Sequence, residues 1–450
     1  MNFETRFLLT FVILIALATV SVAAEPPPNI LVFLADDMGY GDLGCYGHPE
    51  AKTPHLDRLA KEGVKFTQHY ANGPECSPTR TAFLTGRYQQ RAGGLECAIG
   101  TGNVGRYDEA IRLAEQRQLG LPASQAILPG ALKQAGYACG VFGKWHLGYE
   151  PEFNPIEHGW DEFQGYLGGN VHYFNHRETS DLHVLFRGRL PVHREGYMTR
   201  LITDDSIAFL EKHKSKPFFL YVAHECPHFP YQGPDDRNKL VTEANWNVPD
   251  SDTYVKMLEN LDAEVGRLLS AIDKAGISDN TVVVFVSDNG GISSVAHMAG
   301  LRGSKGTTFE GGIRVPLIIR WPNHIEPGSV SHQVSLTFDL TASFLNLAQA
   351  DVAPDRLEGM DIIKHIAEKK PDVERTVFWR GKRDDRTWAA VREGDFKYVR
   401  KTEAGQTEDW LFQIAQDKSE EHDLKQAEAD KLERLKKRLA DWEREVKPVR

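Results

Sequence analysis

Continuous apolar runs that end in polar residues are the strongest pattern along this chain. Four of them cover residues 29–35, 138–142, 217–223 and 281–286, and they are rich in β-branched and aromatic side chains. Runs without polar alternation predict strands that are buried on both faces, and therefore a mostly parallel sheet with helices on each side. Residues 315–319 predict one more strand of this kind.

Amphipathic segments between these runs predict the helices that cover the sheet. Residues 53–60 are expected to form a helix that begins at Pro54 and is capped by Thr53. Residues 253–275 have the periodicity of a long helix that ends at Gly276, and residues 336–349 predict another helix. The first part of the chain is therefore predicted to be an α/β structure.

The pattern changes after about residue 350, where short strand-like segments with turns replace the long buried runs. The turn Glu393-Gly394-Asp395 predicts a hairpin, and apolar residues spaced by three and four from Leu432 to Val446 predict a final helix. We predict a large domain over residues 25–350. A smaller C-terminal α+β subdomain over residues 351–450 would carry an antiparallel sheet and a helix, with strands at 376–379, 387–392, 397–400 and 410–412.

Residues 1–24 have the pattern of a signal peptide. Arg6 precedes an apolar run of 14 residues, and Val22-Ala23-Ala24 offers a small-residue cleavage site. The run is shorter than the ~20 residues of a membrane-spanning helix, although an uncleaved anchor is the alternative. We predict an exported protein, periplasmic or extracellular, without a stable membrane span. The 15 Asn include no Asn-x-Ser/Thr sequon, which favours bacterial export.

The overall charge is acidic, with 53 Lys and Arg against 63 Asp and Glu, a net charge of −10. This balance argues against nucleic acid as a partner, and an anionic substrate would have to be attracted by local positive charge. The number of cysteines, five, is odd. If Cys76 is modified, the other four allow three disulfide pairings, or they are free core thiols: Cys45, Cys97, Cys139 and Cys226.

Acidic and amide side chains follow two of the predicted strands. Asp36 and Asp37 come after residues 29–35, and Asp288 and Asn289 come after residues 281–286. Each pair alone is weak evidence, because an acidic pair after a strand is more often a solvated loop or helix cap, and Asp-Asn-Gly is typical of a turn. In open α/β sheets, however, ligands bind at the carboxyl ends of the strands. Three carboxylates and one amide oxygen there would suit Ca²⁺ or Mg²⁺.

Cationic and imidazole side chains follow the other runs. Lys144 and His146 come after residues 138–142, His228 comes after residues 217–223, and Lys305 lies in a Gly-flanked loop. Taken singly, such residues are more often structural than catalytic. A cleft that combined them with a divalent cation and Arg80 would bind a tetrahedral oxyanion and stabilise charge on a leaving oxygen.

The most specific motif is Cys76-Ser77-Pro78-Thr79-Arg80, continued by Thr81–Gly86. A cysteine two residues before Pro and four before Arg resembles the maturation signature of the type I, formylglycine-dependent sulfatases of the alkaline phosphatase superfamily. The resemblance runs from Pro28 to about Lys425 and implies an alkaline phosphatase-like fold. Its other motifs are Asn29–Gly44, Gly143–Gly148, His158-Gly159-Trp160-Asp161, Pro227–Pro230, Asp288–Gly291 and Gly303–Pro316.

This resemblance implies a chemical role for each candidate residue. A formylglycine-generating enzyme would oxidise Cys76 to 3-oxoalanine (formylglycine), whose hydrate attacks sulfur and whose second hydroxyl later allows release of sulfate. His228, helped by Lys305, would protonate the leaving oxygen, and His146 would be the base that expels sulfate. Arg80 and Lys144 would hold the hydrate, and Lys144 and Lys305 would hold the sulfate oxygens. One Ca²⁺ would be bound by Asp36, Asp37, Asp288 and Asn289, with residue 76 as a further ligand.

The expected function is hydrolysis of sulfate monoesters on a sulfated small molecule, most specifically a sulfated carbohydrate. One alternative is a phosphate or phosphonate ester hydrolase that uses the same aldehyde. A second is a non-catalytic binder of sulfated glycans, which would apply if Cys76 stays a thiol. Residues 94–124 and 168–200 lie outside the shared motifs. We expect them to be loops that carry specificity, with mostly solvated polar residues such as His172, His176, Arg177, His183 and His193.

Overall fold

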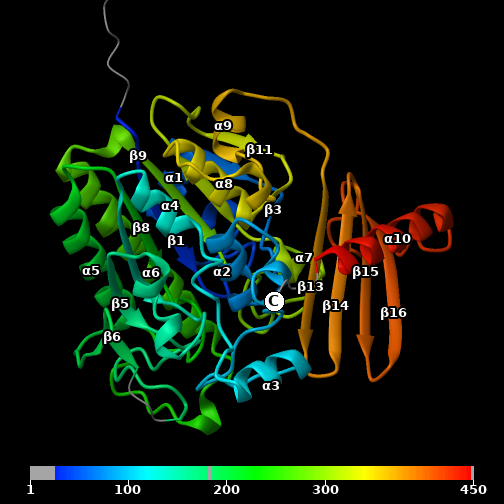
Figure 1. The fold of residues 1–450 in the computed structure, drawn as a ribbon, viewed down its shortest axis with the longest axis horizontal. Coiled ribbons are helices and arrows are strands. Elements are labelled where there is room, and N and C mark those ends of the chain that lie inside the picture. The colour runs from blue at the N-terminus through cyan, green and yellow to red at the C-terminus, as the bar shows by residue number, and fades with distance from the viewer. Residues whose placement is uncertain (1–25, 181–183, 447–450) are drawn as a thin grey trace, which may run out of the picture.

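The computed structural model describes residues 26–180 and 184–446. A ten-stranded sheet runs through its larger part, and four strands near the centre, β9, β1, β8 and β4, lie side by side and parallel. Figure 1 shows this sheet between layers of helices. In spatial order its strands are β11 (Ser329–Ser331), β2 (Val64–Phe66), β10 (Leu317–Arg320), β9 (Thr281–Ser287), β1 (Asn29–Ala35), β8 (Phe218–Ala223), β4 (Ala138–Lys144), β5 (Glu162–Tyr166), β6 (Leu185–Arg187) and β7 (Leu190–Pro191).

The central strands are buried on both faces, as their unbroken apolar runs predict. In β1, Ile30, Val32 and Leu34 pack into one hydrophobic core, and the residues between them pack into a second core on the other face. One core contains residues of α1 (Pro54–Glu62), α5 (Met198–His213) and α6 (Ser251–Ala275). The other contains residues of α2 (Cys76–Thr85), α3 (Asp108–Glu115), α4 (Leu128–Gln134), α8 (Thr337–Leu347) and α9 (Ile362–Ala367).

The outer strands make the sheet mixed. Strand β10 is antiparallel to both β9 and β2, and β5, β6 and β7 pair in antiparallel fashion at the other edge. A separate two-stranded parallel pair joins β3 (His69–Tyr70) to β12 (Ser335–Leu336). The predicted mostly parallel α/β sheet is confirmed, and the antiparallel edges are the detail that the apolar runs did not reveal.

The predicted cap of α1 is wrong in detail. The Thr53 hydroxyl makes no capping bond but donates to the Asp57 carboxylate at 3.1 Å. The backbone N–H groups of His55 and Leu56 donate instead to the buried carboxylate of Asp262 on α6, at 3.1 and 2.8 Å. A residue 206 positions away therefore satisfies the start of this helix.

The C-terminal part is a four-stranded antiparallel sheet with one helix packed across it, as the sequence predicts (Figure 1). Its elements are β13 (Thr376–Arg383), β14 (Arg386–Glu393), β15 (Phe396–Glu403), β16 (Gln406–Gln413) and α10 (Ala429–Glu445). A third hydrophobic core joins this sheet and helix to residues of the larger part, including Ile313 of the short helix α7 (Glu310–Ile313).

The signal peptide predicted over residues 1–24 lies outside the described residues. Within residues 26–180 and 184–446, no helix has the length and apolar character needed to cross a membrane.

Candidate active site

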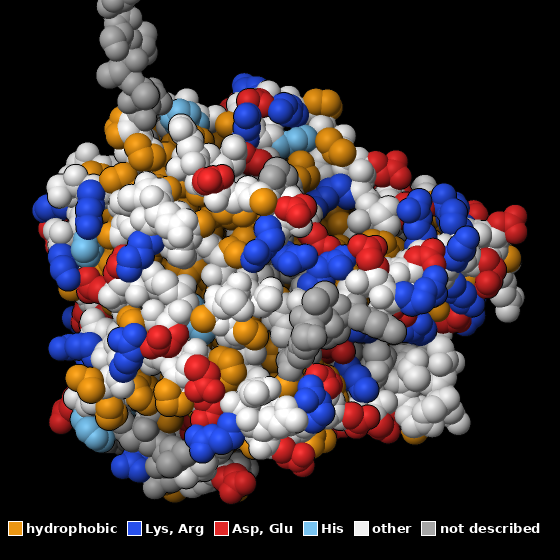
Figure 2. Space-filling view, in the orientation of Figure 1, with side chains coloured by type: hydrophobic (Ala, Val, Ile, Leu, Met, Phe, Trp, Pro, Cys, Tyr) orange, Lys and Arg blue, Asp and Glu red, His pale blue; other side chains and the backbone are white. Residues whose placement is uncertain are grey.

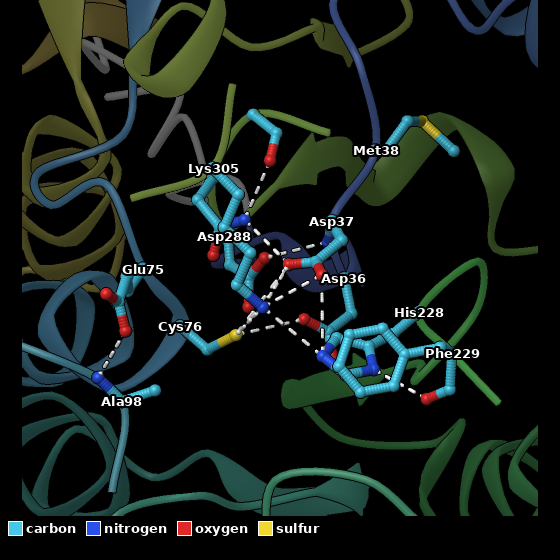
Figure 3. Close-up of polar contacts among 12 residues, drawn as sticks. Asp36, Asp37, Met38, Glu75, Cys76, Ala98, His228, Phe229, Asp288 and Lys305 are labelled. Carbon is cyan, nitrogen blue, oxygen red and sulfur yellow. Dashed lines mark hydrogen bonds and ion pairs between the residues drawn. The ribbon is translucent and has the colours of Figure 1, made fainter. Parts of the chain in front are cut away.

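The candidate residues from distant parts of the sequence meet at the carboxyl ends of the central strands. Asp36 and Asp37 follow β1, Asp288 and Asn289 follow β9, and His228 lies beyond the end of β8. The N-terminus of α2 brings Cys76 to the same place, so that its Sγ lies 3.2 Å from Asp36 Oδ1. Figure 3 shows Asp36, Asp37, Cys76, His228 and Lys305 directed toward one another. The predicted location at this sheet edge is consistent with these contacts.

Cys76 is a fully buried thiol with charged neighbours. Its exposed fraction is 0%, and Lys305 Nζ lies 3.5 Å from its sulfur. Burial raises the pKa of this thiol well above its ordinary value, and the nearby Asp288 and Asp36 carboxylates raise it further. The unmodified sulfur is therefore held as a thiol, which is a much weaker nucleophile than a thiolate.

Side-chain hydrogen bonds fix the start of α2, which carries Cys76. The Ser77 hydroxyl donates to the carbonyl oxygen of His146 at 2.8 Å, just beyond the end of β4. The Thr79 hydroxyl donates to the Gly73 carbonyl at 3.0 Å and accepts from the Gly73 N–H at the same distance. These bonds join the cysteine motif to the chain before it and to the adjacent strand end.

The oxygen ligands at the site fit a hard divalent cation. Asp36, Asp37, Cys76 and His228 each offer an atom that lies within 4.8 Å of the others. Asn289 is fully buried, and its Nδ2 donates to Asp37 Oδ1 at 2.7 Å. Its Oδ1 has no hydrogen-bond donor among the described residues. A buried acceptor without a donor beside buried carboxylates is the arrangement that a Ca²⁺ or Mg²⁺ ligand set requires.

Three cationic side chains pair with the three carboxylates. Lys144 Nζ donates to Asp36, Lys305 Nζ lies 2.7 Å from Asp37 Oδ1, and Arg80 donates two hydrogen bonds to Asp288 Oδ2 at 3.0 and 2.9 Å. Burial lowers the pKa of Lys305, but Asp37 and Cys76 raise it more, so the net pKa is raised. Burial raises the pKa of Asp37, but Lys305 and His228 lower it more, so it stays ionised.

The hydrogen bonds of the two histidines assign their ring nitrogens different roles. His146 Nε2 lies 2.8 Å from the carbonyl oxygen of Ile99, so Nε2 carries the proton and donates. Its buried Nδ1 has no partner among the described residues and is left as a basic lone pair. Burial lowers the pKa of His146 well below its ordinary value, and Lys144 lowers it further, so the ring is neutral.

His228 has the opposite tautomer. Its Nδ1 donates to the Phe229 carbonyl at 2.6 Å, which leaves Nε2 to accept from Lys305 Nζ at 3.2 Å. Burial lowers the pKa of His228 to about 3, although Asp37 raises it in part. The imidazole is therefore neutral at pH 7, and the mobile proton of this pair resides on the ammonium.

Parts of the segments 94–124 and 168–200 are buried, whereas mostly solvated loops are expected there from the sequence. Leu95 to Ile99 are buried, and the Ile99 carbonyl holds His146. His172 and His176 are buried as well, whereas Arg177 is half-buried, His193 is exposed, and His183 lies outside the described residues. The Ile99 contact uses a backbone oxygen, and no side-chain pattern in the sequence could have indicated it.

The structure also shows site neighbours that the sequence analysis missed. Glu75, directly before Cys76, is buried and accepts the Ala98 N–H at 2.8 Å, and Arg383 Nε of β13 donates to it at 3.0 Å. The C-terminal sheet therefore reaches the residue next to the cysteine. All five cysteines are free, which settles the open question of Cys45, Cys97, Cys139 and Cys226 in favour of unpaired thiols.

Comparison with known proteins identifies the family to which the chain is similar. A family model described as Sulfatase matches residues 28–350, and one described as N-sulphoglucosamine sulphohydrolase, C-terminal, matches residues 304–445. N-acetylgalactosamine-6-sulfatase of Mus musculus is 36% identical over 407 residues, which cover 86% of this chain and 74% of that protein. Arylsulfatase A of Homo sapiens is 33% identical over 415 residues, which cover 86% of this chain and 77% of that protein.

Solved structures with the same fold include the crystal structure of Ps i-CgsB. It superposes with a TM-score of 0.80 at 30% identity and covers 92% of each chain. The phosphonate monoester hydrolase of Agrobacterium radiobacter shares the fold at 20% identity with a TM-score of 0.65. Because the Sulfatase model spans most of the chain and the sulfatase relatives cover more than two thirds of it at over 30% identity, this protein belongs to the sulfatase family of sulfuric ester hydrolases.

Proposed function

We propose that this enzyme hydrolyses a sulfate monoester of a carbohydrate with a nucleophile made from Cys76, in the presence of one Ca²⁺. The observation that supports this most directly is the position of the Cys76 sulfur. It lies 3.2 Å from Asp36 Oδ1 and 3.5 Å from Lys305 Nζ, at the centre of the buried carboxylates and cations. A nucleophile there has an anion-binding group and acidic ligands within direct contact.

Asp36, Asp37, Asp288 and Asn289 would hold the Ca²⁺, with residue 76 as a further ligand. The ion would supply positive charge that acidifies the hydroxyl of the matured residue 76 and offsets the charge of the sulfate. Lys144 and Lys305 now pair with Asp36 and Asp37. With the carboxylates engaged as ligands, both ammonium groups would be available to bind the sulfate oxygens, and Arg80 and Lys144 would steady the nucleophile.

Maturation of Cys76 to 3-oxoalanine by a formylglycine-generating enzyme would give a hydrate with two hydroxyl groups. One hydroxyl loses its proton and its oxygen bonds to sulfur as the sulfur–ester oxygen bond breaks. The ester oxygen takes up a proton and leaves as an alcohol, so the step consumes no net proton. The second hydroxyl then loses its proton, the carbon–oxygen bond to sulfate breaks, and the aldehyde is restored. A serine hydroxyl could make the first bond but has no second hydroxyl for release.

The chain's own groups account for the two proton transfers. Lys305 Nζ holds the proton of the Lys305–His228 pair, so the leaving oxygen would be protonated from this ammonium, with His228 Nε2 as the relay. His146 would be the base, because its Nε2–H is fixed on Ile99 and its neutral Nδ1 keeps a lone pair. The two histidines therefore separate the acid and base tasks.

A carbohydrate substrate is supported by the relatives. One is named N-acetylgalactosamine-6-sulfatase, and the Ps i-CgsB structure was also solved in complex with k-i-k-neocarrahexaose. The leader pattern of residues 1–24 supports export to the periplasm or the cell exterior, where sulfated glycans occur.

The mass of one peptide tests the nucleophile. Trypsin releases residues 66–80, which contain Cys76 as their single cysteine. In active enzyme we expect this peptide to be about 18 Da lighter than the unmodified sequence, the difference between a thiol and an aldehyde. The variant Cys76→Ala should lose turnover of 4-nitrophenyl sulfate and keep a near-normal unfolding transition.

Three outcomes distinguish the proposal from its alternatives. Full activity in Cys76→Ala would exclude Cys76 as the source of the nucleophile. An unmodified peptide in protein that binds sulfated oligosaccharides without turnover would indicate a non-catalytic binder. Faster hydrolysis of 4-nitrophenyl phosphate or a phosphonate ester than of 4-nitrophenyl sulfate would indicate the phosphate or phosphonate hydrolase instead.

A further inference from the structure

A cleft of about 550 Å³ opens beside the candidate active site and extends away from it onto the C-terminal sheet. Lys305, which contacts Asp37 and Cys76, is among the residues that line it. The C-terminal sheet contributes Lys382 and Arg383 of β13, Arg386 of β14 and Lys401 of β15 to the same lining. Its volume lies within the ~300–1,000 Å³ range of small-molecule sites and far exceeds the space that a sulfate group fills.

The lining of this cleft is strongly cationic. Five of its side chains carry positive charge, namely Lys305, Lys382, Arg383, Arg386 and Lys401, and one carries negative charge, Glu75. The whole chain has a net charge of −10, and Figure 2 shows acidic and basic side chains interspersed over the face in view. A local excess of positive charge on an acidic protein selects for an anionic ligand.

The charge that remains after ion pairing is carried by the C-terminal sheet. Arg383 is neutralised by Glu75, and Arg386 and Lys401 share the single carboxylate of Glu403. Lys382 makes no salt bridge within residues 26–180 and 184–446, where its Nζ lies 5.8 Å from the centre of the Tyr107 ring. These residues leave two positive charges without an acidic partner, one at Lys382 and one shared by Arg386 and Lys401.

The lining of the cleft also contains a half-buried aromatic residue next to His228. Phe229, which follows His228, lines the cleft, and its ring centre is 4.0 Å from that of the imidazole. An apolar ring beside hydrogen-bonding groups is typical of surfaces that contact the apolar face of a sugar.

We propose that this cationic cleft binds a second anionic group of the substrate, a sulfate or a carboxylate on a sugar next to the one that is desulfated. The inference rests on the proposed function, because the sulfate ester under attack has to lie at Cys76 for the neighbouring sugar to reach Lys382 and Lys401. The substrate is then an oligosaccharide or polysaccharide with repeated negative charges and not an isolated monosulfated sugar.

Titration calorimetry on the full chain tests this cleft. All titrations use the Cys76→Ala background, so that no ester is hydrolysed. The probes are κ-neocarratetraose, whose charges are sulfates, unsulfated chondroitin tetrasaccharide, whose charges are carboxylates, and the neutral neoagarotetraose. We expect Lys382→Ala with Lys401→Ala to weaken binding of a charged tetrasaccharide about ten-fold, the effect of losing charge-assisted contacts. If binding of κ-neocarratetraose weakens, the second anionic group is a sulfate. If binding of the chondroitin tetrasaccharide weakens, it is a carboxylate.

Matched variants separate a binding role from a structural one. The double variant Lys382→Arg with Lys401→Arg keeps both charges and should retain the affinity. The variant Lys369→Ala removes an exposed lysine outside the cleft and should change the dissociation constants less than about two-fold. Unchanged affinity of the alanine double variant for both charged tetrasaccharides overturns the proposal. Hydrolysis of 4-nitrophenyl sulfate by the wild-type chain is a separate measurement, and its failure would count against the proposed function.

Discussion

At the scale of single residues, the site places three buried carboxylates against three buried cations. Asp36, Asp37 and Asp288 are each at most 2% exposed, and they pair with Lys144, Lys305 and Arg80. Charges buried to this extent are stable only when they are paired, and removal of one partner leaves the other uncompensated. The site therefore has a second requirement besides catalysis, which is that its positive and negative charges stay balanced.

This balance predicts how the site responds to Ca²⁺. In chelator-treated protein, we expect Ca²⁺ to bind with measurable heat and to raise the midpoint of thermal unfolding, because an ion that binds only the folded state stabilises it. The variant Asp37→Asn should bind Ca²⁺ more weakly, with a dissociation constant that is raised about ten-fold or more. Asp430→Asn, at an exposed position of α10, should leave it unchanged. Equal affinity in Asp37→Asn and wild type would remove Asp37 from the ligand set.

At the scale of elements, a buried charge cluster links the loop that carries Lys305 to the C-terminal sheet. Glu310, at the start of α7, accepts from Lys397 of β15 at 2.7 Å and from the Tyr70 hydroxyl at 2.8 Å. Lys397 also donates to Glu420 at 2.9 Å, and Glu420 accepts the N–H of Glu310 at 2.7 Å. Glu310 lies five residues after Lys305, so the C-terminal sheet supports the segment that we propose to bind sulfate.

This cluster predicts a stability that falls at low pH. Burial raises the pKa of Glu310, but Lys397 and Arg314 lower it more, so the pKa is lowered to about 2. The charged form is therefore favoured by folding. Its contribution is fully present above the ordinary pKa of a glutamate and is lost as the pH falls from about 4.5 through 2.

The variant Glu310→Gln tests that contribution. It should lower the free energy of unfolding by about 3–5 kcal/mol at pH 7, because Lys397 is left partly uncompensated in the core. The loss should shrink as the pH falls from about 4.5 through 2, because the carboxylate takes up a proton first in the unfolded chain and only near the lower value in the folded protein. Urea unfolding at several pH values measures both effects, with Glu211→Gln on the surface as the control. A loss that is the same at every pH would show that Glu310 is not ionised in the folded protein.

The elements also show what the sequence could and could not predict. Strands β1, β4, β8 and β9 were predictable, because burial on both faces requires unbroken apolar runs in the sequence itself. The direction of β10 was not, since a run such as Leu317–Arg320 reads the same in a parallel or an antiparallel pairing. The cluster of Glu310, Lys397 and Glu420 was also missed, because its partners are up to 110 residues apart and each looks like a surface charge.

Among the candidate site residues, some could also be placed from the sequence and others could not. Residues that follow a strand end, such as Asp36 and Asp288, could be placed from the sequence, because parallel strands bring their carboxyl ends to one edge. The tautomers of His146 and His228 could not, since they depend on the backbone carbonyls of Ile99 and Phe229. The cationic cleft was missed for a related reason: its residues lie on strands of the C-terminal sheet that the sequence did not connect with Cys76.

At the scale of the whole molecule, the C-terminal sheet packs against the segment that precedes Cys76. Gly381 of β13 lies so near this segment that a Cβ at its position would be 2.7 Å from Pro74 Cγ. Pro74 and Glu75 lead directly into Cys76, and Arg383 of the same strand binds Glu75. The two parts of the molecule therefore meet without space for one additional methyl group.

The variant Gly381→Ala tests this close approach. The methyl group should push β13 away from Pro74 and lower the free energy of unfolding by about 1–3 kcal/mol. It should also reduce kcat/KM for 4-nitrophenyl sulfate by about ten-fold, because the start of α2 moves with Pro74. Gly130→Ala in α4, where a Cβ meets open space, should leave activity unchanged. Wild-type kinetics in Gly381→Ala would show that this contact does not position Cys76.

The complete burial of Cys76 has a consequence for when this residue can be modified, relative to folding of the chain. The Cys76 side chain has no exposed surface in the folded chain, so a modifying enzyme that has to bind this segment in an extended form could act only before the chain folds. We therefore expect the proposed oxidation of Cys76 to precede folding of the chain around it. On this expectation, a chain that folds before oxidation keeps an unmodified thiol at position 76 and stays inactive unless it unfolds again.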